Sequence, residues 1–290
     1  MLWQILGIVF PIFAIVLAGF LYARRHAPDM AAANKVTIDV FIPALIFDVL
    51  SGKEFDLLEY QGLAIGCVAV ILGSGLIAWP VARLLGYRVK TFVPPMMFTN
   101  YGNMGLPLAV FAFGEQALPA AVVLFIIGNT LHFSLGMKMM DASVSLGGLL
   151  KIPMLLATVA GLGVSALGGK VPQLLAVPIE MLGQIAIPLM LFALGVRLIH
   201  IDWRAWRIGL VGAVVCPASG LALALPAALL LDLPPFQFAI LVVFGALPPA
   251  VLNYMVAERF GQEPQQVASI VMLGNLGSVV VMPVVLALVL

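Results

Sequence analysis

The residues best suited to hold a small charged molecule lie in one apolar stretch, Pro94 to Gly114. The stretch is long enough to cross a bilayer, but Asn100 and Asn103 carry amides that hydrocarbon does not tolerate unpaired. Pro107 lacks a backbone donor and Gly105 lowers helix propensity, so we expect an interrupted helix. Interrupted backbone at membrane depth persists only where protein buries it or where it lines a wet cavity. The stretch therefore predicts a binding site.

A second stretch, FGALPPAVLNYM, repeats this combination of residue types. Pro248 and Pro249 would interrupt the helix, and Asn253 would add another amide beside the interruption. Free N–H groups and the positive ends of half-helix dipoles can hold a carboxylate without a cationic side chain. No Lys or Arg falls in the middle of a predicted span, so an anion would have to be held in this way. The asparagines either contact the substrate or only cap the half-helices.

Four further polar residues within apolar runs are candidates for proton or ion coupling. His132 is the only histidine within a predicted span, and it is either a proton relay or a neutral, satisfied imidazole. Asp48 lies near the end of its span and either takes part in coupling or reaches the lipid headgroups. Asn129 and Asn275 each follow a glycine and either bond a neighbouring helix or contact a ligand.

Other chemistry is not indicated. Asp39 has a structural explanation, because it lies four residues after Lys35 and the two can pair on one helix face. No cluster of His, Cys, Asp or Glu has the spacing of a metal site, and no GxSxG, HExxH or Walker A sequence occurs. An enzyme, an ATP-driven pump, a cofactor and a metal are therefore not predicted. The net charge of +1 offers no basic patch for nucleic acid.

The elements that must position these residues are membrane helices. The chain of 290 residues is 63% hydrophobic and 9% charged, with a mean hydropathy of +1.17, which indicates an all-α polytopic protein embedded in the lipid bilayer. About 20 residues are needed for each crossing. Ten spans are therefore expected, at approximately 2–23, 34–50, 58–82, 91–113, 119–137, 152–168, 178–197, 208–231, 236–256 and 267–290.

The basic residues predict the orientation. If the N-terminus faces outward, twelve of the fourteen Lys and Arg lie at the inner side, and only Lys53 and Lys170 remain outside. With ten spans, both termini should then face the outside of the cytoplasmic membrane. This interpretation depends on a correct number of spans between the charged loops.

Three weak matches recur at one offset, about half the chain length. IPALIF and IPLMLF are 145 residues apart, two Ser-Gly pairs that precede a proline are 145 apart, and Asn129 and Asn275 are 146 apart. Chance similarity of apolar text is the alternative. As a duplication, the offset gives repeats 1–145 and 146–290, and the second must be inverted because each has five spans. The interrupted fourth and ninth helices would then cross near the midplane.

Three segments carry a resemblance to a known family: NKVTIDVFIPALIFDVLSG, TNYGNMGLPLAVFAFG and ALPPAVLNYMVAERFGQEPQQVASIVMLGNLGSVVVMPVVLALVL. With the ten-span plan, they resemble the auxin efflux carrier family, which joins bacterial transporters to the plant PIN-FORMED carriers. The resemblance implies a scaffold of spans 1, 2, 6 and 7, often dimeric, and a transport unit of spans 3–5 and 8–10. It matches Asn100, Pro107 and Pro248 to the family's fourth-span asparagine and crossover prolines. Asp39 departs from the family pattern, so no function is carried to it.

These features and the resemblance together predict a secondary carrier of small organic anions with elevator-like alternating access. Whether transport is coupled to H⁺ or Na⁺ stays open. The substrate site would consist of seven residues, Asn100, Asn103, Gly105, Pro107, Pro248, Pro249 and Asn253. Two alternatives stay open. One is a sodium-coupled symporter of the bile-acid transporter type, and the other is a membrane sensor or channel on the same fold.

Overall fold

The computed structural model describes residues 2–52, 56–200 and 205–290, and within these ranges the regular elements are helices. Lys53, one of the two basic residues predicted to lie outside, falls outside the described residues. The only pairing of extended backbone in the described part of the chain is an isolated antiparallel bridge between Thr99 and Pro249. The predicted all-α class is confirmed.

Six helical segments of the described residues are long and apolar enough to cross a membrane. Five of them are single helices: α1 (Leu2–His26), α4 (Gln61–Leu84), α10 (Gln173–Arg197), α11 (Trp206–Leu230) and α14 (Pro264–Val289). The sixth, Glu115–Met140, contains α7 (Leu118–Leu131), the π-helical turn His132–Gly136 and α8 (Met137–Met140). Each of the six overlaps a predicted span.

The other four predicted spans coincide with shorter or interrupted helices. They are α2 (Ala31–Val36) with α3 (Ile42–Ser51), α5 (Val89–Met97) with α6 (Leu106–Phe113), α9 (Pro153–Ala166), and α12 (Pro235–Gly245) with α13 (Leu252–Arg259). A π-helical turn, Thr37–Phe41, joins α2 to α3, and another, Tyr101–Gly105, leads into α6. Helical structure therefore occurs at every predicted span, whereas length alone identifies six.

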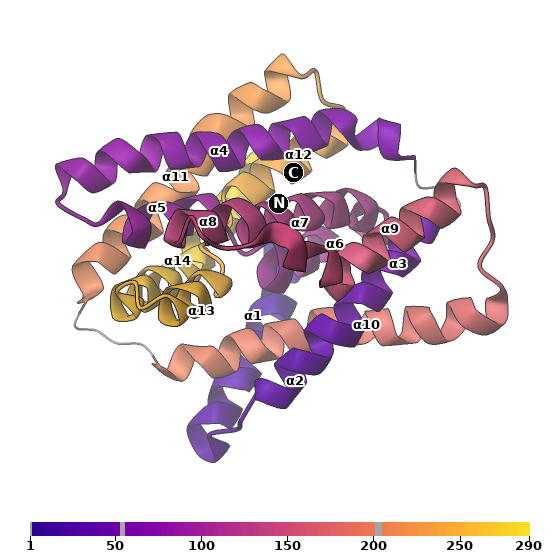
Figure 1. The fold of residues 1–290 in the computed structure, drawn as a ribbon, viewed down its shortest axis with the longest axis horizontal. Helices are drawn as coiled ribbons and strands as arrows, with labels where there is room; N and C mark the ends of the chain where they lie inside the picture. The colour runs from indigo at the N-terminus through magenta and orange to yellow at the C-terminus, as the bar shows by residue number, and fades with distance from the viewer. Residues whose placement is uncertain (1, 53–55, 201–204) are drawn as a thin grey trace.

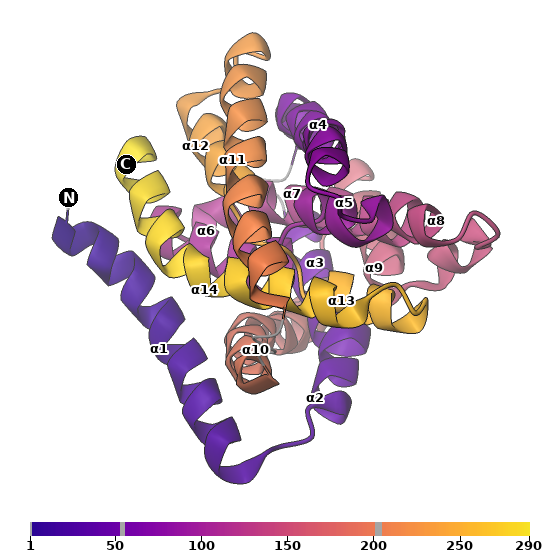
Figure 2. The ribbon, with the colours of Figure 1, turned by 90° about the vertical axis from the view of Figure 1, so that its left-hand side faces the viewer.

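The helices pack in two groups. One contains α1, α3, α9 and α10, and at the crossing of α1 with α10, Gly195 lies against the carbonyl of Val16 with no room for a side chain. The other contains α4, α5, α11, α12, α13 and α14. Figure 2 shows α4, α11 and α12 in the upper part of the molecule and α10 in the lower part. The start of α1 and the end of α14 lie close together in both views (Figures 1 and 2).

The two interrupted helices meet at their interruptions. The N–H of Asn100 donates to the carbonyl of Pro248 over 2.7 Å, and the N–H of Ala250 donates to the carbonyl of Phe98 over 3.0 Å. These bonds satisfy backbone groups that would otherwise be unpaired inside the protein. The broken fourth and ninth helices predicted from the prolines therefore contact each other directly.

The first interruption lies ahead of Pro107 rather than at it. Non-helical backbone begins at Phe98, whereas Pro107 lies in the first turn of α6, directly after the π-helical turn. Proline is well tolerated in a first turn, where its missing N–H removes little, and a π-helical turn accommodates the local change in hydrogen bonding. The position of the interruption therefore depends on the pairing with residues 248–250. The helix propensities of the residues around Pro107 could not predict this pairing.

Candidate functional site

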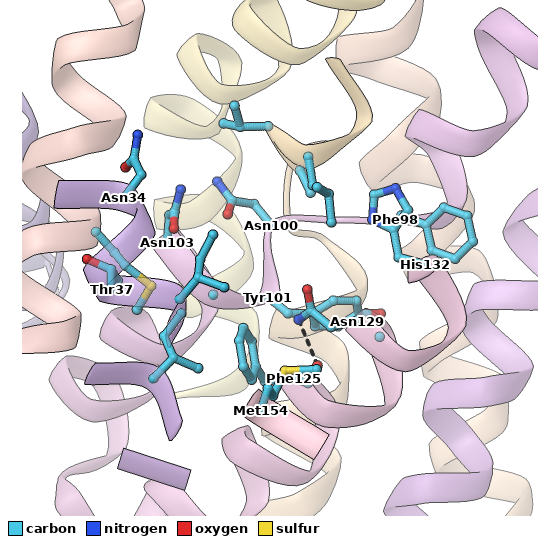
Figure 3. Close-up of a pocket in the computed structure, with 18 of the residues that line it drawn as sticks. Asn34, Thr37, Phe98, Asn100, Tyr101, Asn103, Phe125, Asn129, His132 and Met154 are labelled. Carbon is cyan, nitrogen blue, oxygen red and sulfur yellow. Dashed lines mark hydrogen bonds between the residues drawn. The ribbon is translucent and has the colours of Figure 1, made fainter. Parts of the chain in front are cut away.

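A cavity of about 150 Å³ lies beside the paired interruptions. Its wall combines the first interruption, the start of α13, one face of α7, the turn after α2 and the last turns of α10. In Figure 3, Asn34, Thr37 and Asn103 lie on one side and Asn129 and His132 on the other, with Asn100 between them. Its polar and ionisable lining side chains are those of Asn34, Thr37, Thr99, Asn100, Tyr101, Asn103, Asn129, His132 and Arg197.

Two helix starts face this cavity. One is the helix that begins at Tyr101, and the other is α13. Four residues at these two starts line the cavity: Gly102, Asn103, Val251 and Leu252. Within the described residues, the N–H groups of these four residues donate to no backbone carbonyl. Unpaired N–H groups and the positive ends of two helix dipoles favour an anion at this place.

Two of the predicted asparagines line the cavity and have side-chain N–H groups without a hydrogen-bond partner among the described residues. Asn103 is partly buried and forms no side-chain hydrogen bond with any described residue. Asn129 donates one amide hydrogen to the carbonyl of Phe125 over 2.8 Å, the bond drawn in Figure 3. Since an amide nitrogen carries two hydrogens, both side chains can donate to a ligand.

The other asparagines hold the interruptions together. Asn100 lines the cavity, but its Nδ2 donates to Oδ1 of Asn275 over 3.0 Å. Asn275 in turn donates to the carbonyls of Pro249, over 3.0 Å, and Val271, over 2.8 Å. Asn253 donates to the carbonyl of Phe98 over 2.8 Å and does not line the cavity. Asn253 therefore takes up a freed carbonyl, the capping role that was one of the two interpretations of the amides beside the interruptions. Asn275 bonds residues of neighbouring segments, which was one of the two interpretations of that residue.

The predicted glycine and prolines lie behind the cavity wall. Gly105, Pro107, Pro248 and Pro249 are not among its lining residues. Gly105 packs against the ring of Phe244, since a Cβ added there would lie 2.9 Å from that ring. These residues shape and position the site without contacting the space inside it.

The two candidates for proton coupling differ in position. His132 is buried, lines the cavity and stacks on the ring of Phe98, with centroids 4.3 Å apart and planes 7° apart. It forms no hydrogen bond or ion pair with the described residues. Asp48, in α3, is half-buried and does not line the cavity. Asp39 pairs with Lys35 over 2.6 Å, as the spacing of four residues predicted.

Arg197 is a site residue that the sequence did not reveal. It ends α10, where a basic residue is expected from the positive-inside pattern and the helix dipole. The packing of α10 against the turn after α2 instead places it in the cavity wall. The expectation that amides and dipoles alone would hold an anion is therefore incomplete. The wall also contains Asn34, Thr37 and Tyr101, for which the sequence carries no signal beyond their polarity.

A second hollow, of about 610 Å³, adjoins the cavity. Four residues line both spaces and form the neck between them: Asn34, Ile38, Arg197 and Met255. Pro28, Asp29, Lys35 and Asp39 line the outer hollow only. A small solute could therefore enter the inner cavity from the side of the molecule where α2 begins.

Comparisons with known proteins point to a family of membrane transport proteins. The model of a family described as "Membrane transport protein" matches residues 142–286, half of the chain. A protein of Rhizobium meliloti (strain 1021) named "Putative malonate transporter" is 26% identical over 305 residues. The alignment covers 95% of this chain and 93% of that protein. The similarity thus spans both interruptions and the neck.

Proposed function

Because the chain belongs to the auxin efflux carrier family of membrane transport proteins, we propose that it is a secondary carrier of small organic anions. The family and the apolar helices make it an integral membrane protein with a transport function. The substrate class is supported by the relative named for malonate, a small organic anion.

The observation that carries the proposal is the charge pattern of the inner cavity. Arg197 is the only Lys or Arg among the described residues that line it, and no Asp or Glu is among them. Two helix starts and the amides of Asn103 and Asn129 add partial positive charge. Such a site favours a carboxylate over a cation or a neutral solute of the same size.

The same proposal includes the inverted repeat. Helix starts recur at the offset read from the sequence: Gln61 and Trp206 are 145 residues apart, and Leu118 and Pro264 are 146 apart. Val89 and Pro235 are also 146 apart. Ten spans in two five-span repeats, 1–145 and 146–290, account for this recurrence and for termini that lie close together.

Alternating access would then move one group of helices past the other. The group of α1, α3, α9 and α10 corresponds to the proposed scaffold, through which a homodimer would form, and the interruptions belong to the proposed transport unit. With both termini outside the cytoplasmic membrane, the outer hollow beside Lys35 opens to the inside. The structure would thus correspond to an inward-facing state.

Ion coupling is a separate part of the proposal. His132 remains the candidate for proton coupling because it lines the cavity, whereas Asn129 would act through the substrate. Asp48 and Asn275 lie away from the cavity wall and would act on coupling only indirectly. A sodium-coupled symporter differs from a proton-coupled carrier in its ion dependence, and a channel differs from both in showing no saturation.

The test is counterflow in proteoliposomes with labelled mono- and dicarboxylates at varied pH and sodium. We expect saturable exchange of at least one carboxylate and a loss of about tenfold in apparent affinity for Asn103→Ala. Gln184→Ala is the matched control, because Gln184 is an exposed amide on α10 that bonds only Glu180. Absence of saturable exchange across the whole panel by well-folded protein would contradict the proposal.

A further inference from the structure

The end of α10 explains why residue 197 is basic but not why it lines a cavity. A basic residue in the last turn of α10 is stabilised by the helix dipole. Most such residues extend into water or headgroups, but Arg197 lines both the inner cavity and the outer hollow. It is partly buried there. Burial of a guanidinium is unfavourable unless an anion compensates it.

No described side chain forms an ion pair with Arg197. Within the described residues it forms no ion pair and no side-chain hydrogen bond. Asp29 and Asp39 line the outer hollow beside it, but Asp39 is already paired with Lys35 over 2.6 Å. A guanidinium presents five N–H donors in a planar fork that suits a carboxylate. Since no described residue supplies that carboxylate, the guanidinium is available to a carboxylate of a ligand.

A second anion-binding position lies deeper in the same cavity. The N–H groups at the start of the helix from Tyr101 and the amides of Asn103 and Asn129 form it. These groups come from the π-helical turn before α6 and from α7, whereas Arg197 comes from α10 at the neck. Because the two positions lie on different elements, a short chain with a carboxylate at each end can occupy both of them together.

We propose that Arg197 is the residue that makes this site selective for dicarboxylates, by binding one carboxylate at the neck while the interruption and the amides bind the other. The inference rests on the proposed function, since it names the class of anion for the same cavity. It also gives the neck a role, because a substrate held in this way joins α10 to the first interruption and to α7. A monocarboxylate would leave one of the two positions empty.

The test compares dicarboxylates with their half-amides, which keep the length and remove one charge. Malonate against malonamate and succinate against succinamate are titrated into the purified full chain by calorimetry. In the unmodified protein we expect at least one dicarboxylate to bind about tenfold or more tightly than its half-amide. Arg197→Gln should remove most of this difference and weaken the half-amide far less.

Lys35→Gln is the matched control. Lys35 lies in the same outer hollow and carries the same charge, but it does not line the inner cavity and is already paired. Its removal should leave the ratio of dicarboxylate to half-amide affinity unchanged. Arg197→Lys serves if Arg197→Gln does not fold, because it keeps the charge and loses the planar fork, so the ratio should fall to an intermediate value.

The outcomes separate this inference from the proposed function. Equal affinity of the unmodified protein for dicarboxylates and half-amides would overturn the role of Arg197 and leave an anion carrier intact. An equal loss for both ligands in Arg197→Gln would also overturn it, since Arg197 would then be a general attraction for anions. If no carboxylate of either kind binds to well-folded protein, the proposed function fails and the inference fails with it.

Discussion

Two asparagines that follow a glycine, Asn129 in α7 and Asn275 in α14, share one hydrogen bond of the same kind. Each donates an amide hydrogen to the carbonyl four residues earlier, at 2.8 Å in both helices. Asn275 is buried and adds bonds to Asn100 and Pro249, whereas Asn129 adds none and lines the cavity. The same Gly-Asn pair thus has its amide fully hydrogen-bonded within the protein in α14, whereas in α7 an amide N–H stays available to a ligand.

The difference follows from what each asparagine meets. Asn275 faces the side chain of Asn100, which fills its hydrogen-bonding capacity with protein. Residue 246, at the offset of 146 from Asn100, is an alanine and has no amide to offer Asn129. Under the proposed inverted repeat, this one side-chain difference would leave a single polar site beside two equivalent interruptions.

Replacement of Asn275 should have the largest effect on stability. Asn275→Ala leaves the amide of Asn100 and the carbonyl of Pro249 buried without partners, and each such group costs about 1–3 kcal/mol. We expect the free energy of unfolding to fall by about 2–4 kcal/mol. Unfolding by SDS of the protein in mixed micelles measures it. A free energy of unfolding within about 1 kcal/mol of that of the unmodified protein would show that the hydrogen bond between Asn275 and Asn100 does not stabilise the fold.

The next largest difference in stability is expected between alanine substitutions of the two glycines that precede these asparagines, Gly128 and Gly274. A Cβ on Gly274 would lie 2.6 Å from Cδ of Pro249, a ring fixed to the backbone. A Cβ on Gly128 would overlap the ring of Tyr101, a side chain beside the cavity that, unlike the ring of Pro249, is not closed onto the backbone. Gly274→Ala should therefore lower stability by about 2 kcal/mol, the usual range for overpacking, and Gly128→Ala by less. Thermal unfolding in detergent of both variants side by side decides the order.

Asn129→Ala should act on ligand affinity rather than on stability. The loss of one donor to a carboxylate should weaken binding about tenfold, while the unfolding free energy changes by less than about 1 kcal/mol. Ser134→Ala is the control, because Ser134 also bonds the carbonyl four residues earlier, over 2.6 Å, but does not line the cavity. An equal loss of affinity in both variants would mean that Asn129 is a helix-packing residue.

The smallest expected effect is the coupling between Asn100 and Asn275. A double-mutant cycle with alanine at each position should give about 1 kcal/mol, the range found for hydrogen bonds between membrane helices. The same cycle with Asn100 and Asn129 should give a coupling near zero, because no hydrogen bond joins these two side chains. A coupling of similar size in both cycles would remove the distinction between the two asparagines.

Much of the architecture could be predicted from residue types alone. Apolar runs gave helices at all ten expected places, and the prolines and asparagines marked both interrupted helices. The offset of 145 to 146 also recurs in the starts of three helix pairs. These features are local or periodic, so the chain carries them independently of its final packing.

The site was only partly predictable. Asn100, Asn103, Asn129 and His132 line the cavity as polar residues within apolar runs suggested, whereas Asn253 and Asn275 share that signal and bond the backbone instead. Which of these amides faces the cavity depends on helix rotation, and rotation is set by neighbours such as Phe98 and Pro249.

The sequence by itself determined that this chain is a bundle of apolar helices with two interruptions, because hydrophobicity and the missing donors of proline act at each residue alone. The tertiary structure decided that the interruptions pair with each other and that Arg197 lines the cavity. It also decided that the amide of Asn275 bonds protein groups, whereas that of Asn129 faces the cavity. Each of these depends on residues far apart in the chain being brought within hydrogen-bonding distance, which no single stretch encodes.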